Sequence, residues 1–285
     1  MQLWSKLHLI TLLPSVAGMI LLSALIGWLL RKKSDKIKMI PIQIIAVVII
    51  VLEIFKQIHS AQGGYDLYMI PLHFCSLYLY MLPFMSFYFG KHKDKVRTIT
   101  LVTCTMLFGA MMIYPTIIYG ESSVEGCLQA FTSFDALKNN FLSFHTVVYH
   151  NLILFAFFLI ISLKLFKLNK KADLKVILFT FLGFNIVSAS MANILKTNYN
   201  NFYYSGIGPV NDIRLNLISQ IGVWGQVLYV LFMAFMVIIL AYLSYGVITL
   251  LTHICNKIRA KRNSKQPPAP ALEHNSENSE DKQNL

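Results

Sequence analysis

Residues 68–89 read YMIPLHFCSLYLYMLPFMSFYF, an apolar stretch long enough to cross a lipid bilayer as a helix. Three residues near its start, Pro71, His73 and Cys75, are unusual in such a segment. The rest of the chain is similarly apolar, because 56% of its 285 residues are hydrophobic and only 13% are charged. Soluble domains carry about 25% charged residues. We therefore expect an all-α fold, a polytopic membrane helix bundle.

Seven apolar runs are long enough to be transmembrane helices. They cover residues 9–30, 40–58, 68–89, 98–119, 140–163, 174–195 and 222–250. We expect residues 1–257 to form one seven-helix transmembrane domain. Residues 258–285 are polar and almost free of large apolar groups, so they are expected to be a disordered cytoplasmic tail.

Basic residues lie mainly on one side of these seven spans. The segments after the first, third and seventh spans, and around the end of the fifth, hold 20 of the 25 Lys and Arg residues. The positive-inside rule then places the N-terminus outside and the C-terminus inside the cell. The same rule explains the net charge of +12, so we expect a multi-pass protein of a cell membrane and no nucleic-acid partner.

Polar residues converge at one depth in the outer halves of several spans. With a rise of about 1.5 Å per residue, Glu53 and Cys75 lie about 10 Å below the outer surface, His145 about 7 Å and His150 about 15 Å. Ionisable residues within spans usually face the interior of the bundle or a wet cavity. The sequence therefore predicts a polar pocket. Its further candidate residues, all polar, are Lys56, His73, Asn151, Asn193, Asn198 and Tyr199.

Simpler roles remain open for several of these residues. Glu53 and Lys56 are spaced i, i+3 and could simply neutralise each other. His73 lies near the interface, where a histidine can be solvated. His145 and His150 are about 140° apart around a helix, so we expect one to line the pocket and the other to have a structural role.

Cys75 has the strongest chemical interpretation among the four cysteines. Pro71 suits the first turn of a helix, which would place Cys75 near free backbone N–H groups that favour a thiolate. A histidine at the same depth could take the thiol proton. The alternatives are a packing role or, in an oxidising exterior, a disulfide with Cys127. Cys104 and Cys255 are expected to be inert, and the spacing shows neither a metal site nor a cofactor motif.

Three short stretches, taken in order, resemble one family. They are IPLHFC at 70–75, HNLIL at 150–154 and Asn198–Tyr199, preceded by the acidic Glu53. The chain resembles the bacterial YwaF-type integral membrane proteins, which are related to the vertebrate transmembrane acyltransferase that builds arachidonoyl ether phospholipids. The resemblance implies a Cys75 nucleophile and a His150 base, with His145 as the rival base. The Lys-, Phe- and Ile-rich composition also indicates a bacterial plasma membrane.

The leading functional hypothesis is a membrane acyltransferase, or a lipid hydrolase, that works without a cofactor. Its partners would be membrane lipids, with a phospholipid as acyl donor and a lysophospholipid as acceptor; the sequence leaves protein partners unknown. The alternative is a transporter or small-ligand receptor that uses the same polar residues to bind a ligand or protons. A third possibility is an accessory subunit in which the polar groups only stabilise the bundle.

Overall fold

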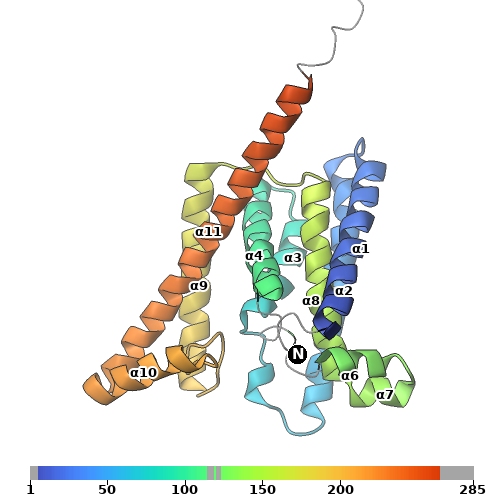
Figure 1. The fold of residues 1–285 in the computed structure, drawn as a ribbon. Helices are drawn as coiled ribbons and strands as arrows, with labels where there is room; N and C mark the ends of the chain where they lie inside the picture. Colours follow the sequence, from blue (N-terminus) through green and yellow to red (C-terminus); the bar gives the residue numbers. More distant parts are fainter. Residues whose placement is uncertain (1–5, 114–118, 120–122, 264–285) are drawn as a thin grey trace, which may run out of the picture. The chain divides into compact units, whose positions relative to one another are not determined.

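The computed structural model describes residues 6–113, 119 and 123–263, and all regular structure in these ranges is helical. The chain divides into two units, residues 1–248 and 249–285. Figure 1 shows the succession of helices along the chain. The helices are α1 (Lys6–Leu30), α2 (Asp35–Ala61), η1 (Leu67–Met69), η2 (Phe74–Ser76), α3 (Leu77–Phe87), α4 (Lys93–Ile113), α6 (Ser123–Ala130), α7 (Phe134–Asn139), α8 (Phe141–Ser162), α9 (Lys170–Ile194), α10 (Gly208–Ile221) and α11 (Val223–Asn263).

Six helices of the described ranges are long and apolar enough to cross a membrane. They are Thr11–Leu30 of α1, α2, α4, α8, α9 and Val223–Ile258 of α11. The third predicted span corresponds to the shorter apolar helix Phe74–Phe87. The all-α membrane bundle is confirmed, whereas the count of seven spans and their orientation stay predictions.

The third predicted span differs from expectation at its start. The chain forms the short helix η1 and then leaves helical geometry from Ile70 to His73, so the expected helical turn behind Pro71 is absent. Proline removes one backbone donor and restricts the residue before it to extended geometry. Helical structure resumes only at Phe74, and the prediction of one continuous helix over residues 68–89 was wrong.

Connections expected to be loops also contain helices. The connection after α4 forms α6 and α7, and the connection after α9 forms the 14-residue helix α10. At the other end of the chain, α11 continues to Asn263, past the expected start of the tail at residue 258. The remainder of the predicted tail, 264–285, and the end of the fourth predicted span, 114–118, lie outside the described residues.

α8 is the central helix of the first unit. It contacts α1, α2, α4 and α6, and its residues Ile153, Leu154 and Ala156 are fully buried. Gly27 permits close packing of α1 on α8, because a Cβ at that position would lie 2.9 Å from the Ser162 Cβ. The same helix carries the two candidate histidines, His145 and His150.

Candidate active site

A cavity of about 580 Å³ lies within the first unit of the chain. Its walls come from α2, the interrupted segment η1–η2, α4, α8, α9, the connection after α9, and α11. This volume lies within the range of about 300–1,000 Å³ that small-molecule pockets occupy. The predicted residues that line it are Glu53, Lys56, His73, Cys75, His145, His150 and Asn198.

Glu53 is the centre of a buried charge cluster at one side of the cavity. Its carboxylate lies 2.8 Å from the Lys56 Nζ and accepts a hydrogen bond of 2.6 Å from the Gln57 Nε2. The second carboxylate oxygen is 3.4 Å from the His145 Nε2. That last contact is electrostatic, because the His145 Nε2 lacks a well-aligned hydrogen bond. The expected pairing of Glu53 with Lys56 is present, yet both residues also face the cavity.

Cys75 lies in the 3₁₀ turn that leads into α3, and it lines the cavity. The expected helix start at Pro71, with Cys75 close behind its first turn, is not found: the turn starts at Phe74, and Cys75 lies within it. Cys75 and Cys127 are both free thiols, so the disulfide considered as an alternative is absent. The Tyr149 hydroxyl of α8 donates a hydrogen bond of 3.1 Å to the Cys75 carbonyl. This bond holds the turn of Cys75 against the helix that carries both histidines.

His150 has a defined tautomer when it is neutral. Its Nδ1 lies 2.6 Å from the Thr146 carbonyl oxygen, and a carbonyl oxygen can only accept a hydrogen bond. The proton must therefore reside on Nδ1, which leaves the lone pair on Nε2. A neutral imidazole with its lone pair on a defined nitrogen, in a cavity that also contains a thiol, is the state that a general base requires.

Both α8 histidines line the same cavity, against the expectation that only one would do so. The cavity is lined by a wide arc of α8, with Tyr149 between the two histidines. The Tyr149 ring stacks on the His145 ring with 5.2 Å between their centres, and it meets the His150 ring edge-on with 5.5 Å between centres. The angle of about 140° between His145 and His150 around the helix therefore does not keep either side chain out of the cavity, because the cavity contacts that whole arc.

His73 occupies the interrupted segment before Cys75. Its Nε2 lies 2.9 Å from the Tyr68 carbonyl, and its ring meets Tyr199 at 5.2 Å. Because a carbonyl oxygen can only accept, the His73 Nε2 donates this hydrogen bond and stabilises the interrupted segment, although the ring also lines the cavity.

Three predicted pocket residues lie beside the cavity and do not line it. The Asn151 amide donates to the Val147 carbonyl and the Tyr119 hydroxyl. The Asn193 oxygen accepts from Gln226 on α11. Tyr199 is fully buried, and its hydroxyl donates to the Leu67 carbonyl. These residues have structural contacts in place of the expected contacts with a ligand, because sequence depth does not determine which way a side chain points.

Asn200 was not predicted, yet it holds the interrupted segment in place. Its amide nitrogen donates to the Leu72 carbonyl at 2.9 Å and to the Ser188 hydroxyl at 2.7 Å. Its amide oxygen accepts from the Phe74 backbone N–H. Asn200 has a φ of 54°, a left-handed conformation that asparagine tolerates better than most residues. The three asparagines among residues 198–201 were the available signal, but Phe74, one of the partners of Asn200, lies 126 residues earlier in the chain.

Another part of the cavity wall is apolar. α4, α9 and α11 contribute it, with Met106, Leu107, Ala110, Phe184, Met233, Met236, Val237 and Leu240. Methionine side chains are flexible and adapt to irregular ligand shapes. The cavity thus combines a charged and hydrogen-bonding part with an apolar part, as an amphiphilic ligand requires.

Two of the other cysteines do not line the cavity, and their expected inertness stays a prediction. Cys104 is fully buried in the hydrophobic core, and Cys255 is exposed on α11. Within the described residues, no group of three or more His, Cys, Asp or Glu side chains is arranged to hold a metal ion.

Comparison with known proteins identifies the family. No curated protein and no solved structure matches the chain. The sequence model of the TMEM164 family matches residues 3–245, which is most of the chain and includes every residue of the cavity. The chain therefore belongs to the TMEM164 family of membrane proteins.

Proposed function

We propose that this protein is a membrane-embedded acyltransferase, or lipid hydrolase, that acts on phospholipid acyl chains through the Cys75 thiol. One observation carries the proposal: a free cysteine in a first helical turn shares a cavity with a histidine of defined tautomer. The resemblance to the YwaF-type proteins adds the expectation of acyl chemistry. By the same resemblance and the composition of the chain, the membrane would be a bacterial plasma membrane.

The Cys75 Sγ attacks the ester carbonyl carbon of a phospholipid while the thiol proton passes to the His150 Nε2. A C–S bond forms, and the C–O bond to the glycerol backbone breaks. The leaving alkoxide takes the proton from His150, which releases a lysophospholipid and leaves a thioester on Cys75. The hydroxyl of a second lysophospholipid, or water, then attacks the thioester carbonyl and gives its proton to the His150 Nε2. A C–O bond forms, the C–S bond breaks, and the leaving Cys75 thiolate takes the proton back from His150. The products are a new phospholipid or a free fatty acid, and the free enzyme is restored.

The shape of the cavity fits such a substrate. The apolar wall from α4, α9 and α11 suits an acyl chain, and the wall with Glu53, Lys56 and Asn198 suits the polar part of a lipid. His145 is paired with Glu53, so it acts as a positioning residue in this proposal and not as the base. Both histidines remain testable as bases because both line the cavity.

The test is transfer of a labelled acyl chain from phospholipid to lysophospholipid in reconstituted membranes. Cys75→Ala should lower the rate by about a hundredfold or more, because the nucleophile is removed. Cys255→Ala is the matched control, since that thiol is exposed and does not line the cavity. His150→Gln should cost about a hundredfold, and His145→Gln less. A Cys75→Ala variant that folds normally and keeps the wild-type rate would overturn the nucleophile.

The charge cluster favours one alternative, a transporter or receptor. Glu53, Lys56 and His145 form a buried ionisable group of the kind that binds ions or protons in transporters. Such a protein should bind or move its ligand equally well with Cys75→Ala and fail with Glu53→Gln. Wild-type protein without transfer or hydrolysis across varied lipid donors would place this alternative first.

A further inference from the structure

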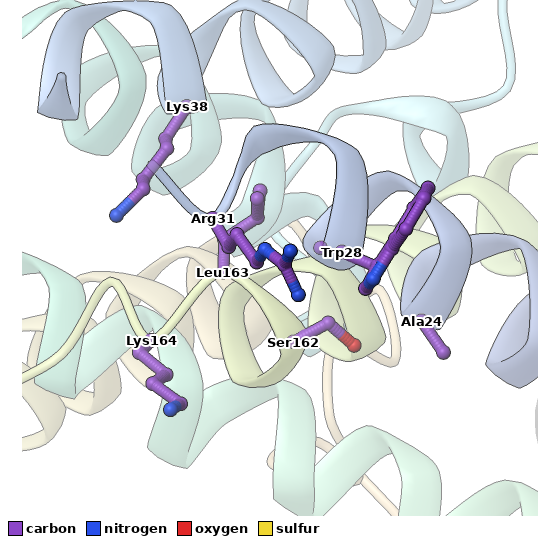
Figure 2. Close-up of a pocket in the computed structure, with 8 residues that line it drawn as sticks. Ala24, Trp28, Arg31, Lys38, Ser162, Leu163 and Lys164 are labelled. Carbon is purple, nitrogen blue, oxygen red and sulfur yellow. The ribbon is translucent and has the colours of Figure 1, made fainter. Parts of the chain in front are cut away.

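A second pocket, of about 350 Å³, lies at the ends of α1 and α8 and the start of α2. Figure 2 shows its lining residues, with the basic side chains of Arg31, Lys38 and Lys164 around the same space. Trp28, Ala24, Gly27, Ser162 and Leu163 complete the wall. It shares no lining residue with the cavity that contains Cys75.

The three basic side chains have no acidic neighbour in the pocket wall. Among the described residues, none of the three forms an ion pair. The nearest acidic residue in the sequence, Asp35, is already paired with Lys93 and Arg97. The pocket therefore gathers three positive charges from three separate elements without a counter-ion from this part of the chain.

Helix ends account for part of this arrangement. Arg31 and Lys164 each follow the C-terminal turn of a helix, where the helix dipole favours a cation. Lys38 lies in the first turn of α2, where the dipole disfavours one. Its contribution to the same pocket is therefore not explained by the helix end on which it lies, and an anion between the three side chains would explain it.

The surroundings indicate what kind of anion. Trp28 is 58% exposed, and Leu25 and Leu29 of the same helix are 52% and 57% exposed. The Arg31 guanidinium lies 5.3 Å from the centre of the Trp28 ring. An exposed indole at the end of a lipid-facing apolar helix is typical of the membrane interface, the level at which lipid headgroups lie.

We propose that this pocket binds the phosphate headgroup of an anionic membrane lipid through Arg31, Lys38 and Lys164. Basic pockets between transmembrane helices bind such headgroups by direct charge attraction. The Trp28 ring holds the Arg31 guanidinium by a cation–π contact and packs against the upper part of the lipid's acyl chain. The site is separate from the proposed catalysis, so it can hold a lipid in a protein that catalyses nothing.

The experiment measures which lipids stay bound to the full-length protein after purification from equimolar phosphatidylglycerol and phosphatidylcholine vesicles, by mass spectrometry. Wild-type protein should retain phosphatidylglycerol preferentially. The triple variant Arg31→Gln, Lys38→Gln, Lys164→Gln should lower this preference by about tenfold or more. The matched control, Lys32→Gln, Lys33→Gln, Lys36→Gln, removes three exposed charges that do not line the pocket, and it should keep the preference within about twofold.

Several results would overturn the proposal. Equal losses in the two triple variants would show a general charge effect of the basic end of the bundle. Displacement of the lipid by millimolar inorganic phosphate, with phosphate bound in its place, would show a site for free phosphate and not for a lipid. If the pocket variant unfolds, Lys164→Gln alone replaces it, because that side chain is exposed, and an unchanged lipid preference there would also contradict the site.

Discussion

The two segments that carry the candidate catalytic residues are built in opposite ways. α8 holds His145 and His150 on an unbroken helix of 22 residues at the centre of the first unit. The segment from Leu67 to Ser76, which holds Cys75, consists of two 3₁₀ turns separated by a non-helical stretch. Local apolar sequence is sufficient to explain α8, whereas contacts from distant parts of the chain hold the interrupted segment.

Those distant contacts come from three sides. Gln57 of α2 donates to the Met69 carbonyl at 2.8 Å, Ser188 of α9 donates to the Leu72 carbonyl at 3.0 Å, and Tyr149 of α8 donates to the Cys75 carbonyl. In a membrane, a backbone carbonyl outside a helix must find a partner within the protein. The interrupted segment therefore has a position in space only when the rest of the bundle is folded around it.

Glu53 of α2 faces His145 of α8 and accepts from Gln57, which in turn donates to the Met69 carbonyl of the interrupted segment, so the loss of Glu53 should have the largest effect. Glu53→Leu leaves Lys56 without its carboxylate and removes the charge that faces His145, which should cost about 3–5 kcal/mol. The double variant Glu53→Leu, Lys56→Met removes both charges and should recover most of this loss. Thermal unfolding in detergent measures both. A single variant as stable as the wild type would show that the cluster does not join α2 and α8.

Asn200→Leu tests the interrupted segment by itself. It leaves the Leu72 carbonyl and the Phe74 N–H with fewer partners and places a branched side chain at a φ of 54°, which should cost about 2–3 kcal/mol. Asn216→Leu is the matched control, because Asn216 is exposed on α10, and it should change stability by less than about 0.5 kcal/mol. Equal losses at both positions would remove Asn200 from this role.

Pro71→Ala should have the smallest effect, although proline first drew attention to the segment. Asn200, Ser188 and Gln57 hold the interruption through the neighbouring carbonyls and N–H groups, so alanine should retain it and lose about 0.5–1 kcal/mol through the unfolded state. The rate at which a thiol reagent labels Cys75 should stay close to that of the wild type. A large change in that rate would mean that the proline itself determines the break.

The sequence was sufficient to predict what depends on local composition. Apolar runs predicted the helices that can cross the membrane. The similar depths estimated for Glu53, Cys75, His145 and His150 predicted that they share a pocket, and all four line one cavity. The estimated depths also placed Asn151 and Asn193 in the pocket, but these residues lie beside the cavity, because their orientation depends on the packing of their helices. The orientation of the bundle still rests on the distribution of Lys and Arg.

The missed features of the two pockets are tertiary. The role of Asn200 depends on a partner more than a hundred residues earlier, and the second pocket depends on the convergence of three helix ends. In neither case does the local sequence identify the partners, because the partners are distant in sequence. For polar residues in the connections between spans, a structure is therefore needed to identify the groups they contact.

Trapping of the acyl-enzyme tests the central claim most directly. Purified protein in lipid is given a labelled phospholipid, quenched rapidly in acid and digested, and the labelled peptide is identified by mass spectrometry. The account predicts an acyl thioester on Cys75 that neutral hydroxylamine removes, formed about a hundredfold more slowly in His150→Gln. Acyl transfer that proceeds with no thioester on Cys75, or with the acyl group on Cys104, Cys127 or Cys255, would contradict it.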